Sequence, residues 1–437
     1  MTALLLAGLV LASPRLVRTA RYNGPDSGDD KVSAVIAVPG GQVCLAGYSF
    51  GHETDFDFCL AAFGRAGAVA WVDRYGSPLG SEDRVWCAGL APGGDVVAAG
   101  GSIAERRQGW DYLVGRYDAS GDTAWLRRLD FAPHSDDKPA GLAVGPDGRI
   151  VVTGRSRNRV DSTQAGDWDI QTVMLTPGGD TAWTRRFDGA ARGDDQAVAA
   201  ATDDSGNCYV AGQTAVPPLG TDVVLLKYGP DGAPRWERRV SGDAPGSDNP
   251  SGVLAAGGRV YSWGALYNKG TSFDYFAACH AGDGTELWQR VLDGTGRPDI
   301  CQAACLDPDG NLVVTGQSTG RSFDILTAKL SAEGETLWTR RFATAGEDRG
   351  WCVATDSAGN VFVGGTSTGP AGFPDMLLLG YGPDGTETWQ HRYSGGGAGE
   401  ARPVALVVDG DRLLVGGHAK FPGTGLDFVL LVFETGD

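Results

Sequence analysis

The sequence predicts an all-β fold, an eight-bladed β-propeller with four antiparallel strands in each blade. First, a Trp recurs at intervals of 50 to 58 residues, a spacing typical of repeated propeller blades. Second, each interval contains four short apolar segments separated by turn residues. Third, small residues build the first segment of each of eight copies, as expected for strands that converge on a central channel. The repeated Trp residues are Trp71, Trp125, Trp183, Trp236, Trp288, Trp338 and Trp389.

One copy, which begins at Asp195, illustrates the four strands. Its segments are QAVAAAT, NCYVAGQT, DVVLLKY and the stretch around RWERRV. Each is too short for a stable helix, and β-branched and aromatic residues recur in the second and third. The intervening turns, such as DDSGN, supply Asp for a type I turn and Gly where the backbone needs positive φ. We therefore expect four β-strands in this copy and in the others.

The two ends of the chain are expected to share the last blade. The eighth copy ends at FVLLVFETGD, after its third strand, and has no Trp strand of its own. The segment LVRTARY, residues 16–22, matches the outer-strand pattern WTRRFDG, so the first strand of the chain should complete the last blade and remove an open sheet edge. Residues 15–437 are then a single propeller, and residues 1–14 are an apolar N-terminal segment or signal peptide.

The repeat resembles a known family. The stretch DDQAVAAATDDSGNCYVAGQT, followed by TDVVLLKYGPDG, is similar to the bacterial β-propeller repeats of the SBBP type. The resemblance covers nearly the whole chain after residue 15, although the fifth copy lacks the acidic turn and the eighth has Glu400 in place of an Asp. It implies a propeller fold and an envelope or extracellular setting, and it carries no uniform activity.

Charge and hydropathy exclude some classes of partner. The formal net charge of −17 would repel phosphate backbones, and Arg pairs occur once per repeat, so we expect no nucleic-acid partner. The apolar run ALLLAGLVLA, residues 3–12, is too short to span a bilayer but suits a secretory signal. We expect an exported monomer, secreted, periplasmic or at the cell surface, with no transmembrane segment. A cytoplasmic protein whose N-terminal segment packs on the fold is the alternative.

A repeated charge pair is also predicted. An Asp precedes every third strand, and an Arg follows 17 residues later in six of the first seven copies. The fifth copy has Val291 there and Arg290 next to it, and Arg21 serves the eighth blade. This spacing places the two on adjacent antiparallel strands, where an ion pair would fix the register. The expected pairs are Asp57–Arg74, Asp111–Arg128, Asp169–Arg186, Asp222–Arg239, Asp324–Arg341, Asp375–Arg392 and Asp427–Arg21.

Acidic residues open the innermost strands, and we expect them to circle one mouth of the channel. Clustered oxygen ligands suit a hard cation such as Ca²⁺, the only cofactor that the sequence suggests. The favoured alternative is structural: each carboxylate accepts backbone N–H bonds within its own blade. The eight acids are Asp30, Asp83, Asp137, Asp195, Asp248, Asp299, Asp348 and Glu400.

The copies differ most in the connection between their second and third strands. We call the face of the ring that carries these connections the loop face, and the opposite one, with its tight PDG turns, the turn face. Basic and aromatic residues on the loop face could bind an acidic peptide or a glycan, or form solvated loops without a partner. Packing is the favoured role of Trp110 and Trp168, which occupy a slot that holds Phe elsewhere. The candidate binding residues are Arg106, Arg107, Trp110, Arg155, Arg157, Arg159, Trp168, Tyr267, Lys269, His418, Lys420 and Phe421.

These features predict a non-catalytic module that binds protein or glycan through the loop face. An intracellular interaction scaffold and an enzyme are the alternatives. The five His residues lie in different copies without a Ser or Cys motif nearby, so catalysis has little support. Eight-bladed quinoprotein dehydrogenases resemble the chain only in a Gly-rich turn before Trp.

Overall fold

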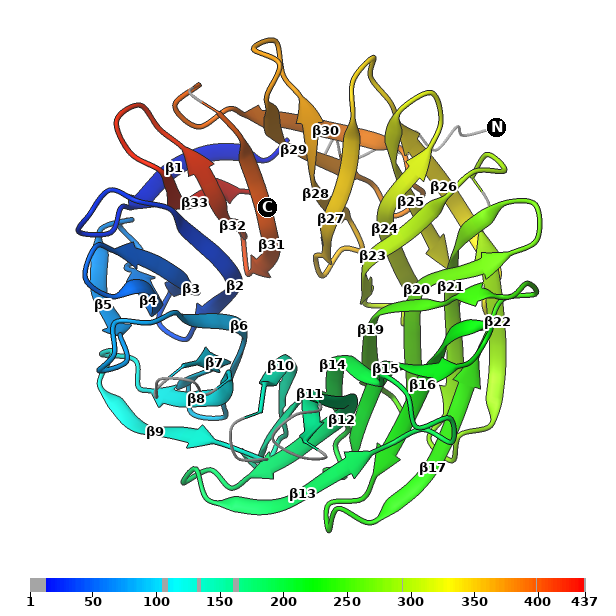
Figure 1. Ribbon diagram of the computed structural model, residues 1–437. Helices are drawn as coiled ribbons and strands as arrows, with labels where there is room; N and C mark the ends of the chain where they lie inside the picture. The colour runs from blue at the N-terminus through cyan, green and yellow to red at the C-terminus, as the bar shows by residue number, and fades with distance from the viewer. Residues whose placement is uncertain are drawn as a thin grey trace, which may run out of the picture.

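The computed structural model describes residues 13–103, 109–131, 135–159, 165–292, 294–397 and 399–435, with the backbone alone at 158, 159 and 165. Eight antiparallel sheets stand around a central channel, as predicted (Figure 1). Each sheet is a blade whose strands run outward from the channel in chain order, except that β1 is the outer strand of the eighth blade. No helix long and apolar enough to cross a membrane occurs in these ranges.

The strands occupy four positions in each blade. The innermost are β2 (Asp30–Val38), β6 (Asp83–Leu90), β10 (Asp137–Val144), β14 (Gln196–Thr202), β19 (Asn249–Ala256), β23 (Asp299–Leu306), β27 (Asp348–Thr355) and β31 (Ala401–Asp409). The second are β3 (Gln42–Gly51), β7 (Val96–Ser102), β11 (Ile150–Arg159), β15 (Cys208–Val216), β20 (Arg259–Asn268), β24 (Leu312–Thr319), β28 (Val361–Thr368) and β32 (Arg412–Lys420).

The third are β4 (Asp55–Phe63), β8 (Asp111–Tyr117), β12 (Ala165–Leu175), β16 (Gly220–Tyr228), β21 (Ser272–Ala281), β25 (Phe323–Leu330), β29 (Pro374–Tyr381) and β33 (Leu426–Glu434). The outer are β5 (Val69–Tyr75), β9 (Thr123–Leu129), β13 (Thr181–Phe187), β17 (Pro234–Val240), β22 (Glu286–Leu292), β26 (Thr336–Phe342), β30 (Glu387–Tyr393) and β1 (Arg15–Tyr22). A two-residue strand, β18 (Gly246–Ser247), pairs in parallel with β16.

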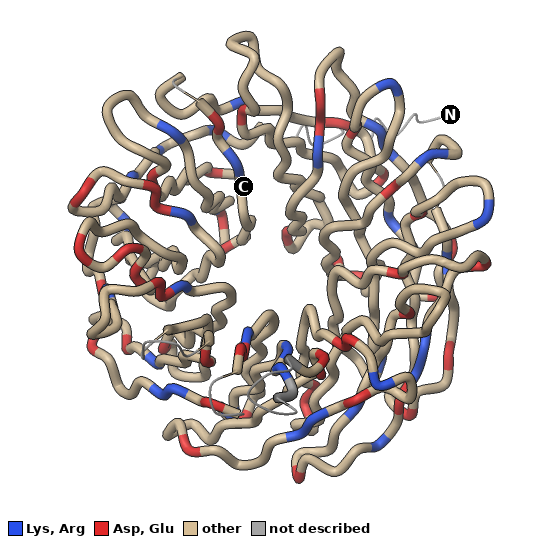
Figure 2. The backbone as a smooth tube through the Cα atoms, in the orientation of Figure 1, with Lys and Arg blue, Asp and Glu red and all other residues tan. Residues whose placement is uncertain are grey.

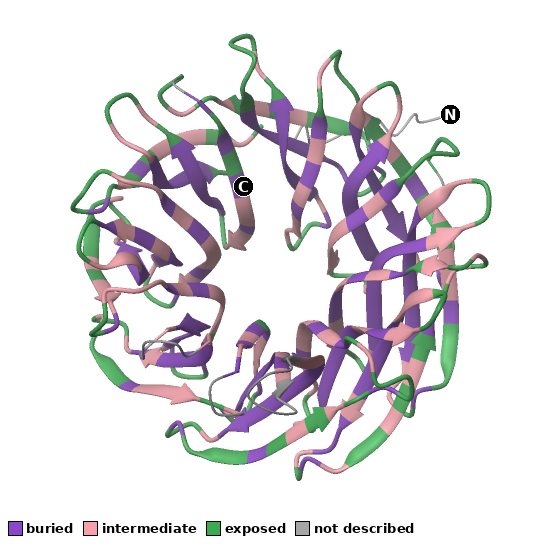
Figure 3. Cartoon of the chain, in the orientation of Figure 1, coloured by how far each residue is buried: buried purple, intermediate pink, exposed green. Residues whose placement is uncertain are grey.

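The hydrophobic core lies between neighbouring blades. The second and third strands are the most buried, whereas the outer strands are largely exposed (Figure 3). One cluster joins Phe58 and Leu60 of the first blade to Leu113 and Tyr117 of the second, all at most 1% exposed. Because successive side chains of a strand point to opposite faces, every central strand contributes to two such interfaces. The ring therefore holds together by blade-to-blade burial.

The first strand closes the ring, as predicted. Strand β1 pairs antiparallel with β33, with Tyr22 opposite Phe428 (Figure 1). The side chains of Arg21 and Asp427 form an ion pair, and Ala20 joins a core cluster shared by the last and first blades. The eighth blade thus contains the two ends of the folded chain, and its outer edge is covered.

The repeated Trp links each blade to the next one. In six blades its indole Nε1 donates a hydrogen bond to a carbonyl of the following blade's turn. The next turn's Gly packs against the ring: Gly385 has φ +80°, and a Cβ there would lie 2.7 Å from Trp338. The bonds run from Trp71 to Ala119 (3.1 Å), Trp125 to Pro177 (3.0 Å), Trp183 to Pro230 (3.1 Å), Trp236 to Gly282 (3.2 Å), Trp288 to Ala332 (2.9 Å) and Trp338 to Pro383 (3.0 Å).

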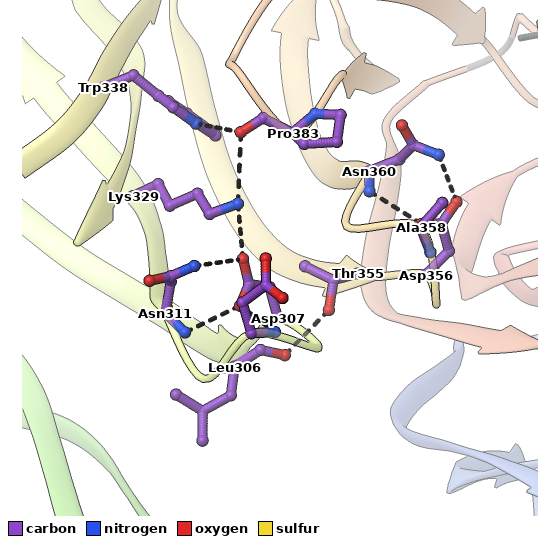
Figure 4. Close-up of polar contacts among 11 residues, drawn as sticks. Leu306, Asp307, Asn311, Lys329, Trp338, Thr355, Asp356, Ala358, Asn360 and Pro383 are labelled. Carbon is purple, nitrogen blue, oxygen red and sulfur yellow. Dashed lines mark hydrogen bonds and ion pairs between the residues drawn. The ribbon is translucent and has the colours of Figure 1, made fainter. Parts of the chain in front are cut away.

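A buried ion pair reinforces one of these links (Figure 4). Lys329 Nζ lies 2.6 Å from Asp307 Oδ2 and donates to the Pro383 carbonyl oxygen at 3.3 Å, the same atom that accepts from Trp338. Asn311 Nδ2 also donates to Asp307, at 2.9 Å. Burial alone would raise the pKa of Asp307, but the bonds from Lys329 and Asn311 outweigh it and lower the pKa. Both charges are therefore compensated.

All seven predicted Asp–Arg ion pairs are present. The Asp57–Arg74 pair, for example, has an N–O distance of 2.5 Å. The pairing is diagonal, however: Arg74 lies opposite Cys59, because a β-bulge beside the turn shifts the register. In the fifth blade Arg290 bonds to the Gly334 carbonyl instead, at 2.8 Å. The other pairs join Arg21 to Asp427, Arg128 to Asp111, Arg186 to Asp169, Arg239 to Asp222, Arg341 to Asp324 and Arg392 to Asp375.

We predict that Trp338→Phe lowers the free energy of unfolding by about 1 kcal/mol, because Phe keeps the ring contact but cannot donate to Pro383. Trp338→Ala should cost about 3–5 kcal/mol, since it also removes buried ring area. Trp389→Phe is the matched control, because Trp389 packs against His391 and Phe433 and donates no hydrogen bond to a turn carbonyl within the described residues. Urea unfolding midpoints measure all three; equal losses for both Phe variants would contradict the hydrogen-bond contribution.

Candidate binding site on the loop face

Each innermost strand contains a β-bulge. One residue in each of these strands has no partner in the second strand, and a bulge redirects such a side chain. The residue before each bulge lies opposite a Gly of the second strand. A Cβ on Gly154 would lie 2.1 Å from the Lys138 carbonyl oxygen, so only Gly permits this approach. The bulge residues are Ser33, Trp86, Ala140, Val198, Ser251, Gln302, Trp351 and Val404.

The predicted ring acids lie inside the blades. Seven are at most 3% exposed, and each accepts a backbone N–H from the connection that enters its blade, two residues after the preceding outer strand. Asp195 also accepts from Ala215 N, at 3.1 Å. This is the structural arrangement favoured above. The donors and acceptors are Gly24 to Asp30 (2.6 Å), Ser77 to Asp83 (2.5 Å), Phe131 to Asp137 (2.9 Å), Gly189 to Asp195 (2.5 Å), Gly242 to Asp248 (3.1 Å), Gly294 to Asp299 (2.6 Å) and Thr344 to Asp348 (2.5 Å).

The eighth acid was wrongly assigned. In β31 the position that Asp holds elsewhere belongs to Ala401, which is buried and lies opposite Ala419. Glu400 is exposed and precedes the strand; its carbonyl accepts from Lys420 N, as that of Glu347 accepts from Thr368 N in the seventh blade. Glu400 is therefore equivalent to the residue before the Asp that recurs in the other blades, and the last blade has Ala401 in place of that Asp.

Burial changes the acidity of these groups. It raises the pKa of Asp30, Asp83 and Asp137 to about 6, although bonds from neighbouring groups favour the charged form. It raises the pKa of Asp195 and Asp248 as well. The carboxylates that tie one blade to the next are thus costly to ionise.

Two other groups of three carboxylates could hold a metal ion. Asp111, Asp130 and Asp137 offer oxygens within 4.8 Å of one another, and a second group offers the same. Within the described residues, neither group contains two of the predicted ring acids. Each includes an Asp already paired with an Arg, whose charge competes with a cation. The second group is Asp167, Asp169 and Asp188.

Basic residues follow the first position of several innermost strands and reach over the preceding blade. Arg84 lies over Phe56, with its Cζ 4.6 Å from the ring centroid, and Arg349 lies 4.2 Å over Phe323. Arg402 lies 3.8 Å over Trp351. These cation–π contacts hold positive charges on the loop face, and basic segments border the channel in Figure 2.

The structure brings four predicted residues together in the second and third blades. Trp110 packs against Trp86, with ring centroids 5.3 Å apart and ring planes tilted by 46°. Arg155 and Arg157 of β11 lie over Trp168, with Cζ atoms 4.5 and 4.8 Å from the ring. Trp110 therefore packs against an aromatic side chain, and Trp168 packs against two basic ones.

A hollow of about 380 Å³ adjoins this cluster. Three bulge residues, one from each of three consecutive blades, form part of its wall, so it lies on the channel side. Sequence reasoning missed Trp86, Lys138 and Gln196; the Gly in every second strand was the available signal of a bulge. The lining residues are Trp86, Lys138, Pro139, Ala140, Arg155, Gln196, Ala197 and Val198.

Hydrogen bonds order the wall beside the hollow. Arg155 Nη1 donates to Gln196 Oε1 at 2.6 Å, Gln196 Nε2 to Gln213 Oε1 at 2.8 Å, and Gln213 Nε2 to Asn249 Oδ1 at 2.5 Å. This chain crosses three blades and gives each amide a defined direction.

The remaining predicted residues lie elsewhere. Tyr267 and Lys269 line a separate hollow of about 560 Å³ with Arg297, at the fifth and sixth blades. His418 is 7% exposed; burial, then Arg402 and Lys31, lower its pKa to about 4, so it is neutral at pH 7.

Phe421 of the last blade lies 4.0 Å beneath the Arg21 guanidinium, and Lys420 is exposed. The structure does not unite these residues with the cluster of the second and third blades. Arg106, Arg107 and the side chain of Arg159 lie outside the described residues.

Comparisons with known proteins agree with the fold. A family model described as outer membrane protein assembly factor BamB matches residues 169–372, slightly less than half of the chain. No curated protein sequence matches. Chaetomium thermophilum Sqt1 is 13% identical, with a TM-score of 0.56 over 95% of this chain and 97% of that one. A Dyadobacter fermentans protein of unknown function is 11% identical, with a TM-score of 0.45 over 97% and 100%. The SBBP resemblance stays a prediction.

We predict that Ca²⁺ does not shift thermal unfolding measured first in EDTA and then in millimolar Ca²⁺, because the ring acids already accept backbone N–H bonds. A ligand at 100 times its Kd would add about 2.7 kcal/mol and raise the midpoint by a degree or more. Such a rise, abolished by Asp137→Asn, would instead identify a metal site that includes Asp137.

We predict that Asp137→Asn raises the free energy of unfolding, and that the increase grows with pH. A folded pKa of about 6 against an ordinary value of 3.8 means that ionisation of Asp137 opposes folding. The penalty is absent below pH 4 and complete above pH 6, where it approaches about 3 kcal/mol. Between pH 4 and pH 7, the urea midpoint of the Asn variant should therefore rise relative to that of the native protein. Parallel profiles for the two proteins would show that Asp137 titrates normally.

Proposed function

We propose that this chain is a non-catalytic binding module that recognises protein or glycan through its loop face. The observation that carries the proposal is the basic and aromatic cluster beside the hollow, in a protein of net charge −17. Within the described residues, none of Lys138, Arg155 and Arg157 forms an ion pair. Aromatic and Arg side chains that are held in place and still accessible are the usual anchors of binding surfaces.

Export to the cell envelope is part of this proposal. It draws support from the apolar segment at residues 3–12 and from the family match, whose description names an outer membrane protein assembly factor. We infer that the chain acts as a recognition or scaffold component there and works as a monomer. An intracellular scaffold with the same loop face is the alternative setting.

The binding role is tested with two matched Trp variants. Trp86 and Trp351 hold the same bulge position, but Trp86 lines the hollow, whereas Trp351 donates to Thr366 Oγ1 at 3.0 Å and packs under Arg402. Immobilised native protein, Trp86→Ala and Trp351→Ala are exposed to a glycan array and to purified bacterial envelope proteins. We predict that Trp86→Ala alone weakens the selected ligand tenfold or more.

Two results would contradict binding through the hollow. Equal binding by both folded variants would place recognition away from the hollow, and no ligand on either panel would remove its basis. Titration with pyrroloquinoline quinone tests the enzyme alternative; a stoichiometric absorbance change with dye reduction would favour a dehydrogenase.

A further inference from the structure

We propose that the hollow between the second, third and fourth blades binds an acidic polypeptide segment, with a carboxylate against Lys138 and Arg155 and an apolar side chain on the wall formed by Trp86, Ala140 and Val198. This proposal rests on the proposed function and specifies its ligand. It follows from the charge, the shape and the backbone edges of the site.

The charges of the site are accessible and held in place. Lys138 Nζ lies 5.8 Å from the Trp110 ring centroid and 6.0 Å from that of Trp168, and the Arg155 guanidinium lies over Trp168. Both side chains are half-buried. Arg155 uses Nη1 on Gln196, which leaves other N–H groups of the planar fork for a carboxylate. Preorganised cations of this kind favour anionic ligands, because little side-chain entropy is lost on binding.

The shape of the site follows from the bulges. Trp86, Ala140 and Val198 are the bulge residues of consecutive blades, and the two small ones leave the space that Trp86 borders. On another blade, Trp351 occupies the same position beneath Arg402. The shared backbone therefore gives an open apolar wall beside Lys138 and Arg155, and an apolar side chain buried there would add to the binding energy.

The backbone around the hollow favours a polypeptide over a sugar. Strands β10 and β14 have a neighbour on one side only, so their channel-side edges are not paired within the sheets. Such edges offer main-chain donors and acceptors to an extended segment, while alternate side chains enter adjacent pockets. An acidic glycan would match the cations but not this row of backbone groups.

The test uses fluorescence anisotropy with the full chain and a fluorescein-labelled peptide of Glu residues interrupted by two Phe residues. Peptides with Gln or Lys in place of Glu and an oligogalacturonate complete the probe set. We expect only the Glu peptide to bind, with an affinity that falls as salt rises. Lys138→Gln and Arg155→Gln should each weaken it on the order of tenfold. Trp86→Phe, which keeps an aromatic wall, should weaken it less than Trp86→Ala.

The matched control is Arg349→Gln. Arg349 holds the position of Lys138 in the seventh blade and also lies over an aromatic ring, but it pairs with Glu347 at 3.1 Å. Its loss should leave the affinity unchanged, which separates a local contact from a general effect of net charge. Thermal unfolding checks that each variant is folded.

Other outcomes overturn the proposal. Equal affinity of the Lys138 and Arg155 variants and the native protein would rule out recognition of the carboxylate by these cations. Binding of oligogalacturonate alone, weakened by the same variants, would make the occupant an acidic glycan. If no anionic probe binds while Trp86→Ala still impairs a ligand from the panels above, the acidic specificity is wrong and the binding module stands. If nothing binds in either experiment, both proposals fail.

Discussion

The link between the Trp of one blade and the turn of the next is the interaction on which the ring depends. It joins an indole N–H, a turn carbonyl and a Gly at positive φ, as in Trp338, Pro383 and Gly385. Each part has a physical requirement: the carbonyl needs a donor once it is covered, and the ring needs a flat neighbour without a Cβ. A phrase such as GPDG followed by Trp therefore recurs because the second to sixth blades each both donate and accept such a bond.

The repetition of the backbone also explains how a symmetric scaffold carries a local site. The Gly in each second strand allows a close strand approach, and the bulge that accompanies it redirects one side chain per blade. The backbone is common to all blades, whereas the bulge residue varies from Ser33 to Trp351. The blades therefore differ at this position beside the channel as well as in the connections of the loop face.

Most of the fold could be predicted from the sequence because repetition averages out local ambiguity. Eight blades, the closure by β1 and the Asp–Arg pairs all rest on spacings that recur. Single positions were harder to predict than repeated ones. Glu400 was confused with Ala401 because a shift of one residue keeps an acid near the strand start but reverses the direction of its side chain. Trp86 was missed because a bulge breaks the alternation by which inward and outward residues are told apart.

The pairing of β1 with β33 affects the order in which the protein can fold. Arg15 bonds to Glu434 across 419 positions of sequence, so the last contact of the ring needs almost the whole chain. Contacts of such long range are slow to form, and in a growing chain the first strand must wait while seven blades assemble. Until β33 has formed, β1 has no partner strand in the ring. Closure therefore acts as a check on completeness: a chain cut short anywhere before its final strand leaves the ring open.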